Sequence, residues 1–120
     1  MTREDRLAEI ADYVRYLDLL LDRAAAGVDW SRATLVVLGF SQGAVTACRW
    51  AQHRHARGAA PPVSRLVLWG GSVPHDLDLA ADGEFLRQAR LTMVVGREDP
   101  YATPDAVAAL RRLLDAHREA

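Results

Sequence analysis

The chain has 120 residues, of which 50% are hydrophobic and 26% charged, and its formal net charge is −1. These totals predict one globular domain, residues 1–120, and the balanced charge gives no electrostatic attraction to nucleic acid. The longest apolar run is too short to span a bilayer, so stable membrane insertion is not expected. The single Cys48 cannot form an internal disulfide and no apolar signal segment follows the N-terminus, so we expect a cytoplasmic location.

Residues 2–26 predict an amphipathic helix. Thr2 and Asp5 form a capping-box pattern at its start, and Gly27 is placed to end it. Apolar side chains recur at steps of three and four residues, and we expect this face to be buried in the core: Leu7, Ile10, Val14, Leu17 and Leu21.

Two elements follow on either side of a tight turn. Residues 33–40 are a continuous apolar run rich in β-branched side chains, typical of a strand that is covered on both faces. Residues 44–56 continue as a helix, which we expect to close at Gly58.

The turn between them reads Gly-Phe-Ser-Gln-Gly over residues 39–43, the G-x-S-x-G pattern of a nucleophile elbow. A sharp strand-to-helix turn presents the hydroxyl of Ser41 clear of the backbone, where a base and a substrate carbonyl can both reach it. The two glycines are expected to let the helix pass close to the neighbouring strands. The backbone N–H of Gln42 and the helix dipole are then placed to stabilise an oxyanion. The alternative is a glycine-rich turn in a parallel sheet with an incidental serine.

Two more strands and a helix complete the chain. Residues 63–69 and 91–95 are apolar runs that predict strands, and the mixed segment between them includes a short helix around Phe85. Thr103 and Pro104 open a last helix as its cap and first residue. Its apolar side chains share one face: Val107, Leu110, Leu113 and Leu114.

Strands that alternate with helices indicate the α/β class, here a parallel sheet of about three strands joined by crossover helices. Because such crossovers are right-handed, they place all their helices on the same face of the sheet. The strands are apolar on both sides, so the other face is left bare. We therefore expect the chain to associate with itself or with a complementary chain that covers this face, and the first strand to present an open hydrophobic edge.

Asp99 is a candidate functional carboxylate. It lies just past the end of the third strand, at the edge where ligands bind in open α/β sheets. Glu98 is the competing carboxylate, which we interpret as a solvated turn residue. For Asp99 the alternative is a turn-forming role ahead of Pro100.

A serine nucleophile needs a general base, and the chain has four histidines. His53 and His55 lie roughly 18 Å along the helix from Ser41, and His117 lies about 20 Å from the start of its own helix, so none of these three can be the base. His75 follows the second strand on the functional edge and is the candidate base or, failing that, a residue of the pocket rim. Phosphate binding is an alternative for the basic end of the middle helix. That end also carries Arg49, Arg54 and Arg57.

No metal or cofactor is expected. An acidic segment, residues 76–84, suggests calcium, but Ala80 and Ala81 stand where an EF-hand loop needs an oxygen ligand and a glycine. No phosphate-binding glycine motif of a nucleotide fold is present in the sequence. We interpret Cys48 as a small buried apolar residue rather than a reactive thiol.

Three segments together resemble the α/β-hydrolase fold and, within it, the phospholipase and carboxylesterase group that includes acyl-protein thioesterases. They are residues 39–44 (GFSQGA), residues 66–71 (LVLWGG) with Pro74 after them, and residues 96–100 (GREDP) followed by Pro104. The resemblance covers nearly the whole chain but only the middle of a full family member. We therefore expect a partial α/β-hydrolase fold that lacks the N-terminal strands and the C-terminal segment with the catalytic histidine.

The resemblance implies that Ser41 is the nucleophile, Gln42 the oxyanion donor and Asp99 the acid of the triad. The expected activity is hydrolysis of carboxylic ester or thioester bonds in a small ester or acyl substrate, with a base supplied by His75 or by a partner chain. The alternative is a catalytically inert partial hydrolase domain, which serves only as a fold fragment or a partner-binding module.

Overall fold

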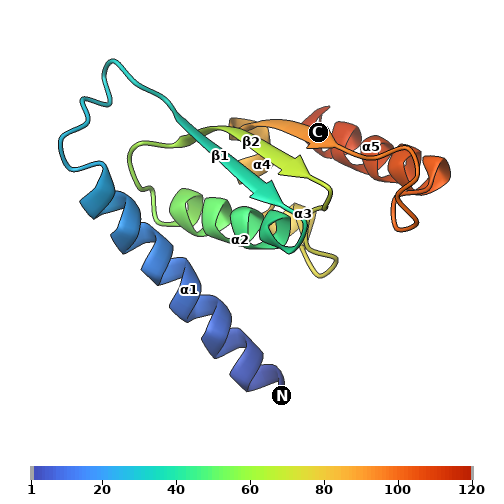
Figure 1. The fold of residues 1–120 in the computed structure, drawn as a ribbon, viewed down its shortest axis with the longest axis horizontal. Coiled ribbons are helices and arrows are strands. Elements are labelled where there is room, and N and C mark those ends of the chain that lie inside the picture. The colour runs from blue at the N-terminus through green and yellow to red at the C-terminus, as the bar shows by residue number, and fades with distance from the viewer. Residues whose placement is uncertain (1, 120) are drawn as a thin grey trace.

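The computed structural model describes residues 2–119, in which helices alternate with strands (Figure 1). The elements in chain order are α1 (Arg3–Ala24), β1 (Leu35–Phe40), α2 (Gln42–Ala56), β2 (Val63–Trp69), α3 (Leu79–Asp82), α4 (Phe85–Gln88), β3 (Arg90–Val94) and α5 (Pro104–Glu119). Within these residues, no helix is long and apolar enough to cross a membrane.

The strands form a three-stranded parallel sheet in the order β1-β2-β3. Val37 of β1 pairs with Leu66 of β2, which pairs in turn with Leu91 of β3. The predicted α/β class and the parallel sheet are therefore confirmed, and β1 is an edge strand as expected. The second strand has the predicted bounds, whereas the third lies one residue earlier than predicted.

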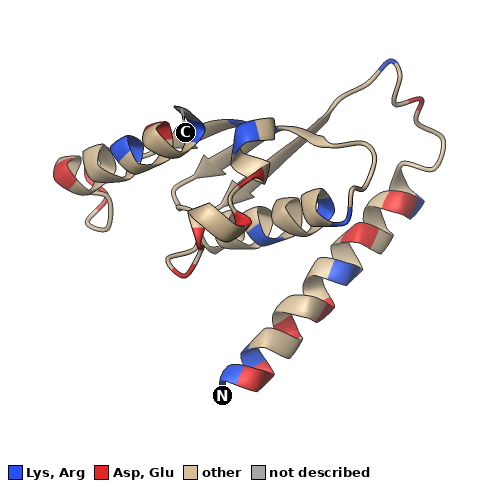
Figure 2. Cartoon of the chain, turned by 180° about the vertical axis from the view of Figure 1, so that it is seen from behind, with Lys and Arg blue, Asp and Glu red and all other residues tan. Residues whose placement is uncertain are grey.

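The core fills the space between one face of the sheet and the helices. Leu66 and Leu68 of β2 are fully buried there, together with Ala44 of α2 and Leu86 of α4. Helix α2 contacts β1 and β2, and α1 packs on α2 rather than on the sheet. The charged side chains lie mainly on the helices and loops (Figure 2).

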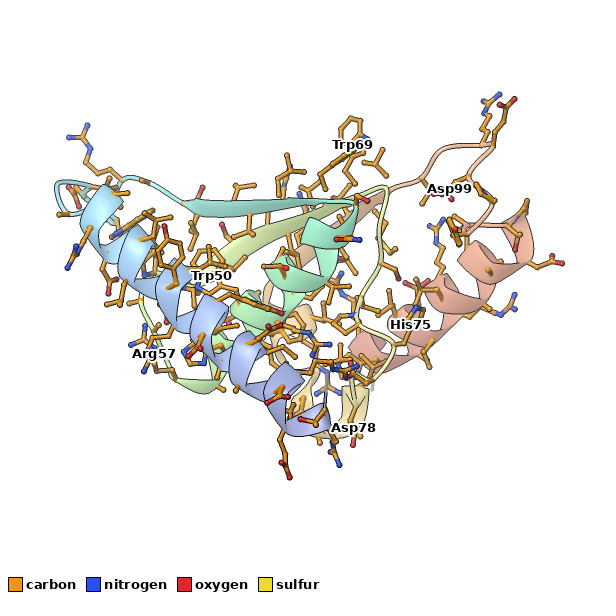
Figure 3. All side chains as sticks on the ribbon, turned by 60° about the horizontal axis from the view of Figure 1, so that its bottom comes forward. Trp50, Arg57, Trp69, His75, Asp78 and Asp99 are labelled. Carbon is orange, nitrogen blue, oxygen red and sulfur yellow. The ribbon has the colours of Figure 1, made fainter. Side chains whose placement is uncertain are left out.

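The other face of the sheet is bare within residues 2–119. In Figure 3, α1 and α2 lie beneath the sheet and Trp69 projects on the opposite side. Burial alternates along β1, so Val37 is buried while Leu38 is 61% and Phe40 69% exposed. One face of β1 is therefore bare within the described residues, as predicted from the handedness of the crossovers, which brings the helices to one face only.

The helix ends follow local side-chain chemistry. Thr2 Oγ1 accepts a hydrogen bond from the N–H of Asp5 at 3.0 Å, and the Asp5 carboxylate accepts one from the N–H of Thr2, which confirms the capping box. Thr103 Oγ1 accepts from the N–H of Ala106 at 3.2 Å, as predicted for its cap. Gly58 follows α2 with φ of +64°, in the left-handed conformation that closes helices.

The predicted buried face of α1 is only partly buried. Val14 is in the core, but Leu7 at the other end of the same face is 50% exposed. At that end α1 meets a polar loop, where Arg6 pairs with Asp76 at 2.9 Å, and Leu7 does not pack against the hydrophobic core. The helix also ends at Ala24, three residues before the glycine predicted to stop it.

An ionic cluster around the buried side chain of Asp18 joins α1 to α2. Its Oδ1 accepts hydrogen bonds from Trp50 Nε1 at 2.8 Å and Arg54 Nη1 at 2.9 Å, and its Oδ2 accepts one from Arg57 Nη2 at 2.8 Å. Burial alone would raise the pKa of Asp18. The hydrogen bonds from Trp50 and Arg54 and the nearby arginine charges outweigh that effect, and the pKa lies below its ordinary value.

We expect Asp18→Asn to lower the free energy of unfolding at pH 7 by about 3 kcal/mol, because it leaves Arg54 and Arg57 without an anionic partner. Since folding lowers the pKa of Asp18, the carboxylate stabilises the protein at pH above about 4, and this contribution is lost as the pH falls through the folded-state pKa. The difference in the free energy of unfolding between wild type and variant, measured by urea unfolding, should therefore become smaller at acid pH.

The matched control is Asp12→Asn on the same helix, where the carboxylate is exposed and contacts only the exposed Arg15 at 3.5 Å. It should change the stability by less than about 0.5 kcal/mol. Equal losses in the two variants would contradict the role given to the Asp18 cluster.

Candidate functional site

Ser41 alone connects β1 to α2. The strand ends at Phe40 and the helix begins at Gln42, so one residue makes the whole change of direction. Ser41 has φ of 57° and ψ of −119°, a backbone conformation that residues with a side chain rarely adopt. Its N–H donates to the carbonyl of Trp69 at 2.8 Å, which ties the turn to the end of β2. Ser41 is exposed at the edge of the sheet where the strands have their carboxyl ends.

Two glycines make this turn sterically feasible. A Cβ at Gly39 would lie 2.5 Å from the carbonyl oxygen of Gly43 and 2.7 Å from the Cα of Ala44. A Cβ at Gly71, just past β2, would overlap the carbonyl oxygen of Ser41 and lie 2.6 Å from the Cβ of Ala44. Close packing of the turn therefore requires glycine at positions 39 and 71.

Gly43 does not have the predicted packing role. A Cβ at this position would have no neighbour within 4 Å, so the helix does not need glycine there to approach the strands. The close approach is made at Gly71 instead, because β2 lies next to β1 and ends beside the turn. In the sequence, the signal for this close approach was the pair Gly70 and Gly71, which follows the second apolar run.

Ser41 and Gln42 open into a cleft of about 600 Å³. Its walls are the start of α2, the loop after β2, the end of β3 and the inner face of α5, which Figure 1 shows beside the sheet. Most of the lining is apolar and includes Val73, Leu77, Leu79, Met93, Val107 and Leu110. The apolar face predicted for the last helix thus lines the cleft, and only Leu114 of that face is fully buried.

Asp99 lines the same cleft, from the loop after β3. It is half-buried, and its Oδ1 accepts a hydrogen bond from the N–H of Tyr101 at 2.9 Å. The loop is closed by a second bond, from the N–H of Ala102 to the carbonyl of Asp99 at 3.1 Å. The carboxylate therefore has a fixed position at the sheet edge, and the turn-forming role and a place at the cleft occur together. Glu98, its neighbour, is exposed and does not line the cleft.

His75 also reaches the cleft, as an exposed residue of its rim. Figure 3 shows it further along the loop after β2 than the sheet edge, on the side of Asp78, while Asp99 lies near the sheet edge. Across residues 2–119, no histidine hydrogen-bonds to Ser41 or Asp99.

The other histidines and the basic end of α2 are engaged elsewhere. His53 Nε2 lies 3.4 Å from the Asp18 carboxylate, His55 Nδ1 bonds Gln88 at 2.8 Å, and His117 Nε2 bonds the carbonyl of Gly83 at 2.8 Å.

The arginines at the basic end of α2 pair with carboxylates: Arg49 with Asp76, and Arg54 and Arg57 with Asp18. These contacts give the arginines a structural role within the protein, and nothing among the described residues adds support to the phosphate-binding alternative.

The acidic segment holds structural side chains. Asp78 caps α3 by accepting hydrogen bonds from the N–H groups of Ala80 and Ala81. The part of the chain that the structure describes holds no group of three or more potential metal ligands. Cys48 is buried, and that burial raises the pKa of its thiol to about 12, which suits the apolar role predicted for it.

A family model described as serine hydrolase (FSH1) matches residues 6–120. The chain belongs to the FSH1 serine hydrolase family. This family is α/β-hydrolase-like, so the resemblance predicted from three short segments is confirmed at the level of fold and hydrolase class. Neither the curated proteins nor the solved structures contain a match to the chain.

For this member of the serine hydrolase family we expect Gly71→Ala to lower the free energy of unfolding by about 1–3 kcal/mol, because the added methyl group overlaps backbone atoms that cannot move aside. Urea unfolding provides the measurement. Gly43→Ala is the matched control and should be neutral or slightly stabilising, since it has open space and alanine favours helix. A loss of similar size in the control would show that the turn is not packed as described.

Proposed function

We propose that the chain hydrolyses carboxylic esters or thioesters, with Ser41 as the nucleophile. The observation that carries this proposal is the position of Ser41, alone in a left-handed turn and exposed at an apolar cleft that it shares with Asp99. A serine with an ordinary structural role has no need of such a strained conformation. Membership of a serine hydrolase family supports the same chemistry.

The start of α2 supplies the proposed oxyanion site. The backbone N–H of Gln42 is the first of a 15-residue helix and donates to no acceptor among residues 2–119. An oxyanion formed next to Ser41 would accept from this N–H and lie at the positive end of the helix dipole. Removal of one such donor typically costs about 100-fold in rate or more.

The proposed reaction has two halves. The Oγ of Ser41 attacks the carbonyl carbon and passes its proton to an imidazole. The tetrahedral intermediate then expels the alcohol or thiol, which takes that proton and leaves an acyl-serine. In the second half, water gives a proton to the imidazole and attacks the acyl carbon, the bond between that carbon and Oγ of Ser41 breaks, and Oγ takes the proton from the imidazole as the carboxylic acid leaves. Asp99 orients the imidazole, which comes from His75 after a movement of its loop or from a partner chain.

The lining of the cleft suggests the substrate class. Side chains of the loop after β2, of β3 and of α5 form an apolar wall that continues away from Ser41. An apolar acyl chain buried against this wall gains about 0.8 kcal/mol for each methylene group. We therefore propose carboxylesters, including those of lipids, and thioesters whose acyl group is apolar.

A second candidate is a catalytically inert module that only binds a partner. The observation that favours it is that no histidine of the described residues contacts the two candidate catalytic side chains. Three histidines contact groups outside the cleft, and His75 bonds neither Ser41 nor Asp99. Without a base, a serine hydrolase retains only residual activity.

The cytoplasm remains the proposed place of action. The composition supports it, because the single cysteine of the chain cannot form an internal disulfide of the kind that is common in oxidising compartments.

Labelling with a fluorophosphonate probe tests the nucleophile. We expect the native chain to be labelled well above the denatured chain, because only the folded turn activates a serine, and we expect Ser41→Ala to abolish the label. Ser72→Ala is the matched control, since Ser72 also lines the cleft but lies outside the turn. Its labelling should equal that of the wild type, as measured by fluorescence after electrophoresis.

The outcomes separate the two candidates. Labelling of the native chain no faster than that of the denatured chain supports the inert module, and labelling that persists in Ser41→Ala places the nucleophile elsewhere. The same assay on His75→Ala shows the source of the base. An unchanged rate excludes His75 and leaves a partner chain.

The apolar wall predicts a preference for long acyl groups that Leu110→Trp removes, because the indole fills space inside the cleft. Relative to an ethyl fluorophosphonate, the labelling rate with an octyl fluorophosphonate should fall about tenfold. Leu19→Trp, on the exposed side of α1, is the control and should leave the ratio of the two rates unchanged. An unchanged ratio in Leu110→Trp would contradict an acyl site along α5.

A further inference from the structure

His75 occupies a tight turn in the loop between β2 and α3. The N–H of Leu77 donates to the carbonyl of Pro74 at 3.2 Å, so His75 and Asp76 are the two central residues of this turn. Neither of them can be displaced far without carrying the other along. Whatever fixes the side chain of Asp76 therefore fixes the position of His75 as well.

The carboxylate of Asp76 joins this turn to two helices. Its Oδ2 accepts a hydrogen bond from Arg6 Nη2 of α1 at 2.9 Å, and its Oδ1 accepts one from Arg49 Nη2 of α2 at 3.1 Å. Desolvation raises the pKa of Asp76, but the charge and hydrogen bond of Arg49 and the charge of Arg6 outweigh it, and the pKa lies below its ordinary value. We call the contacts of Asp76 with Arg6 and Arg49 the clamp.

The clamp holds His75 away from the two residues that a base would have to join. Arg49 follows Ser41 by eight residues in the sequence, so its Cα lies about 12 Å, or about two helical turns, further along α2. The turn with His75 is tied beside this part of the helix. In Figure 3, His75 accordingly lies on the side of Asp78, while Asp99 lies near the sheet edge.

The loop is long enough to bring His75 back to Ser41. Gly71 lies against the carbonyl oxygen of Ser41, so the start of the loop is fixed beside the nucleophile. Four residues of extended chain span at most about 14 Å, which keeps His75 within reach of the cleft around Ser41. Among residues 2–119, the N–H groups of Ser72 and Val73 donate to no backbone acceptor, so this part of the loop can change direction without loss of such a bond.

We infer that Asp76 is a positioning residue, whose clamp holds His75 away from Ser41 and whose release lets the same turn carry the imidazole to the nucleophile. The inference rests on the proposed function, because it takes His75 as the base. The side chains of Asp76, Arg6 and Arg49 are 51%, 56% and 21% exposed, so water and salt compete with the clamp. An exposed ion pair shifts an equilibrium by about fivefold or less, and the clamp therefore restrains the turn without locking it.

Disulfide trapping measures the approach of the two positions without any catalysis. In the double variant Ser41→Cys/His75→Cys, an intramolecular disulfide forms only when the two Cα atoms come within about 7 Å, and the buried Cys48 does not compete. We expect Asp76→Asn in this background to speed disulfide formation about three- to tenfold, as measured by electrophoretic mobility. Asp12→Asn removes an exposed, paired carboxylate on α1 and is the matched control, which should leave the rate unchanged.

Ionic strength provides a second measurement that needs no change at Asp76. An increase from about 0.05 M to about 1 M NaCl should speed trapping in the parent double variant, because salt screens exposed ion pairs. The same increase should have no such effect once Asp76→Asn has removed the clamp. The difference between the two backgrounds separates release of the clamp from a general effect of salt on thiol chemistry.

Fluorophosphonate labelling of Ser41 connects the clamp to the proposed chemistry. We expect Asp76→Asn to raise the labelling rate by the same factor as the trapping rate, whereas the double variant His75→Ala/Asp76→Asn should be labelled no faster than His75→Ala. Asp76→Glu keeps the charge and should remain close to the wild type. A purely structural role of Asp76 predicts the opposite sign, a slower rate in Asp76→Asn.

The outcomes distinguish failure of the clamp from failure of the proposed function. Trapping rates that do not respond to Asp76→Asn overturn the clamp, as does labelling that is lost in Ser41→Ala but equal in wild type and Asp76→Asn, and in both cases the nucleophile stands. Faster labelling in Asp76→Asn that persists without His75 also overturns the inference. Absence of labelling above the denatured chain in every variant overturns the proposed function and the inference with it.

Discussion

The structure depends on one steric constraint, the close approach of the first turn of α2 to the ends of β1 and β2. Gly39 and Gly71 both lie against backbone atoms of this turn, where no side chain fits. The chain has only Ser41 with which to pass from strand to helix, so this residue takes a left-handed conformation and its N–H is fixed to the end of β2. Such strain persists only where the surrounding structure holds it, as the two glycine contacts do here.

The proposed chemistry follows from this turn. A serine that is forced out of the strand direction has an exposed hydroxyl, and the helix that begins one residue later leaves the N–H of Gln42 without an intrahelical acceptor. Asp99 comes from a different loop, and the parallel direction of the strands brings both loops to the same edge of the sheet. The apolar wall of the cleft depends on α5, which returns beside that edge.

Sequence patterns predicted the features that depend on neighbours in the chain. The caps at Thr2 and Thr103 and the turn at Ser41 each involve residues within a few positions, so their chemistry is visible in a short window. The Asp18 cluster was not predicted, because its hydrogen bonds join residues 32, 36 and 39 positions apart. A single acid in an otherwise apolar stretch of leucines was the available signal.

Features that depend on packing were predicted less well. The pattern around Ser41 assigned close contacts to Gly39 and Gly43. The contact at Gly39 is present, but the second lies at Gly71, because contact with a neighbouring strand depends on how the sheet is assembled. His75 was predicted at the sheet edge as a base or a rim residue. It reaches the rim of the cleft but lies further along the loop after β2, because its position depends on the path of that loop. The bare face of the sheet was predicted, since the handedness of crossovers determines which side the helices cover.

A crystal structure of the chain after reaction with an octyl fluorophosphonate tests the central claim most directly. We predict phosphorus bonded to Oγ of Ser41, the phosphonyl oxygen within hydrogen-bond distance of the N–H of Gln42, and the alkyl chain against α5. Phosphorus bonded to another residue, or Ser41 unmodified and in an ordinary strand or helix conformation, would contradict the account.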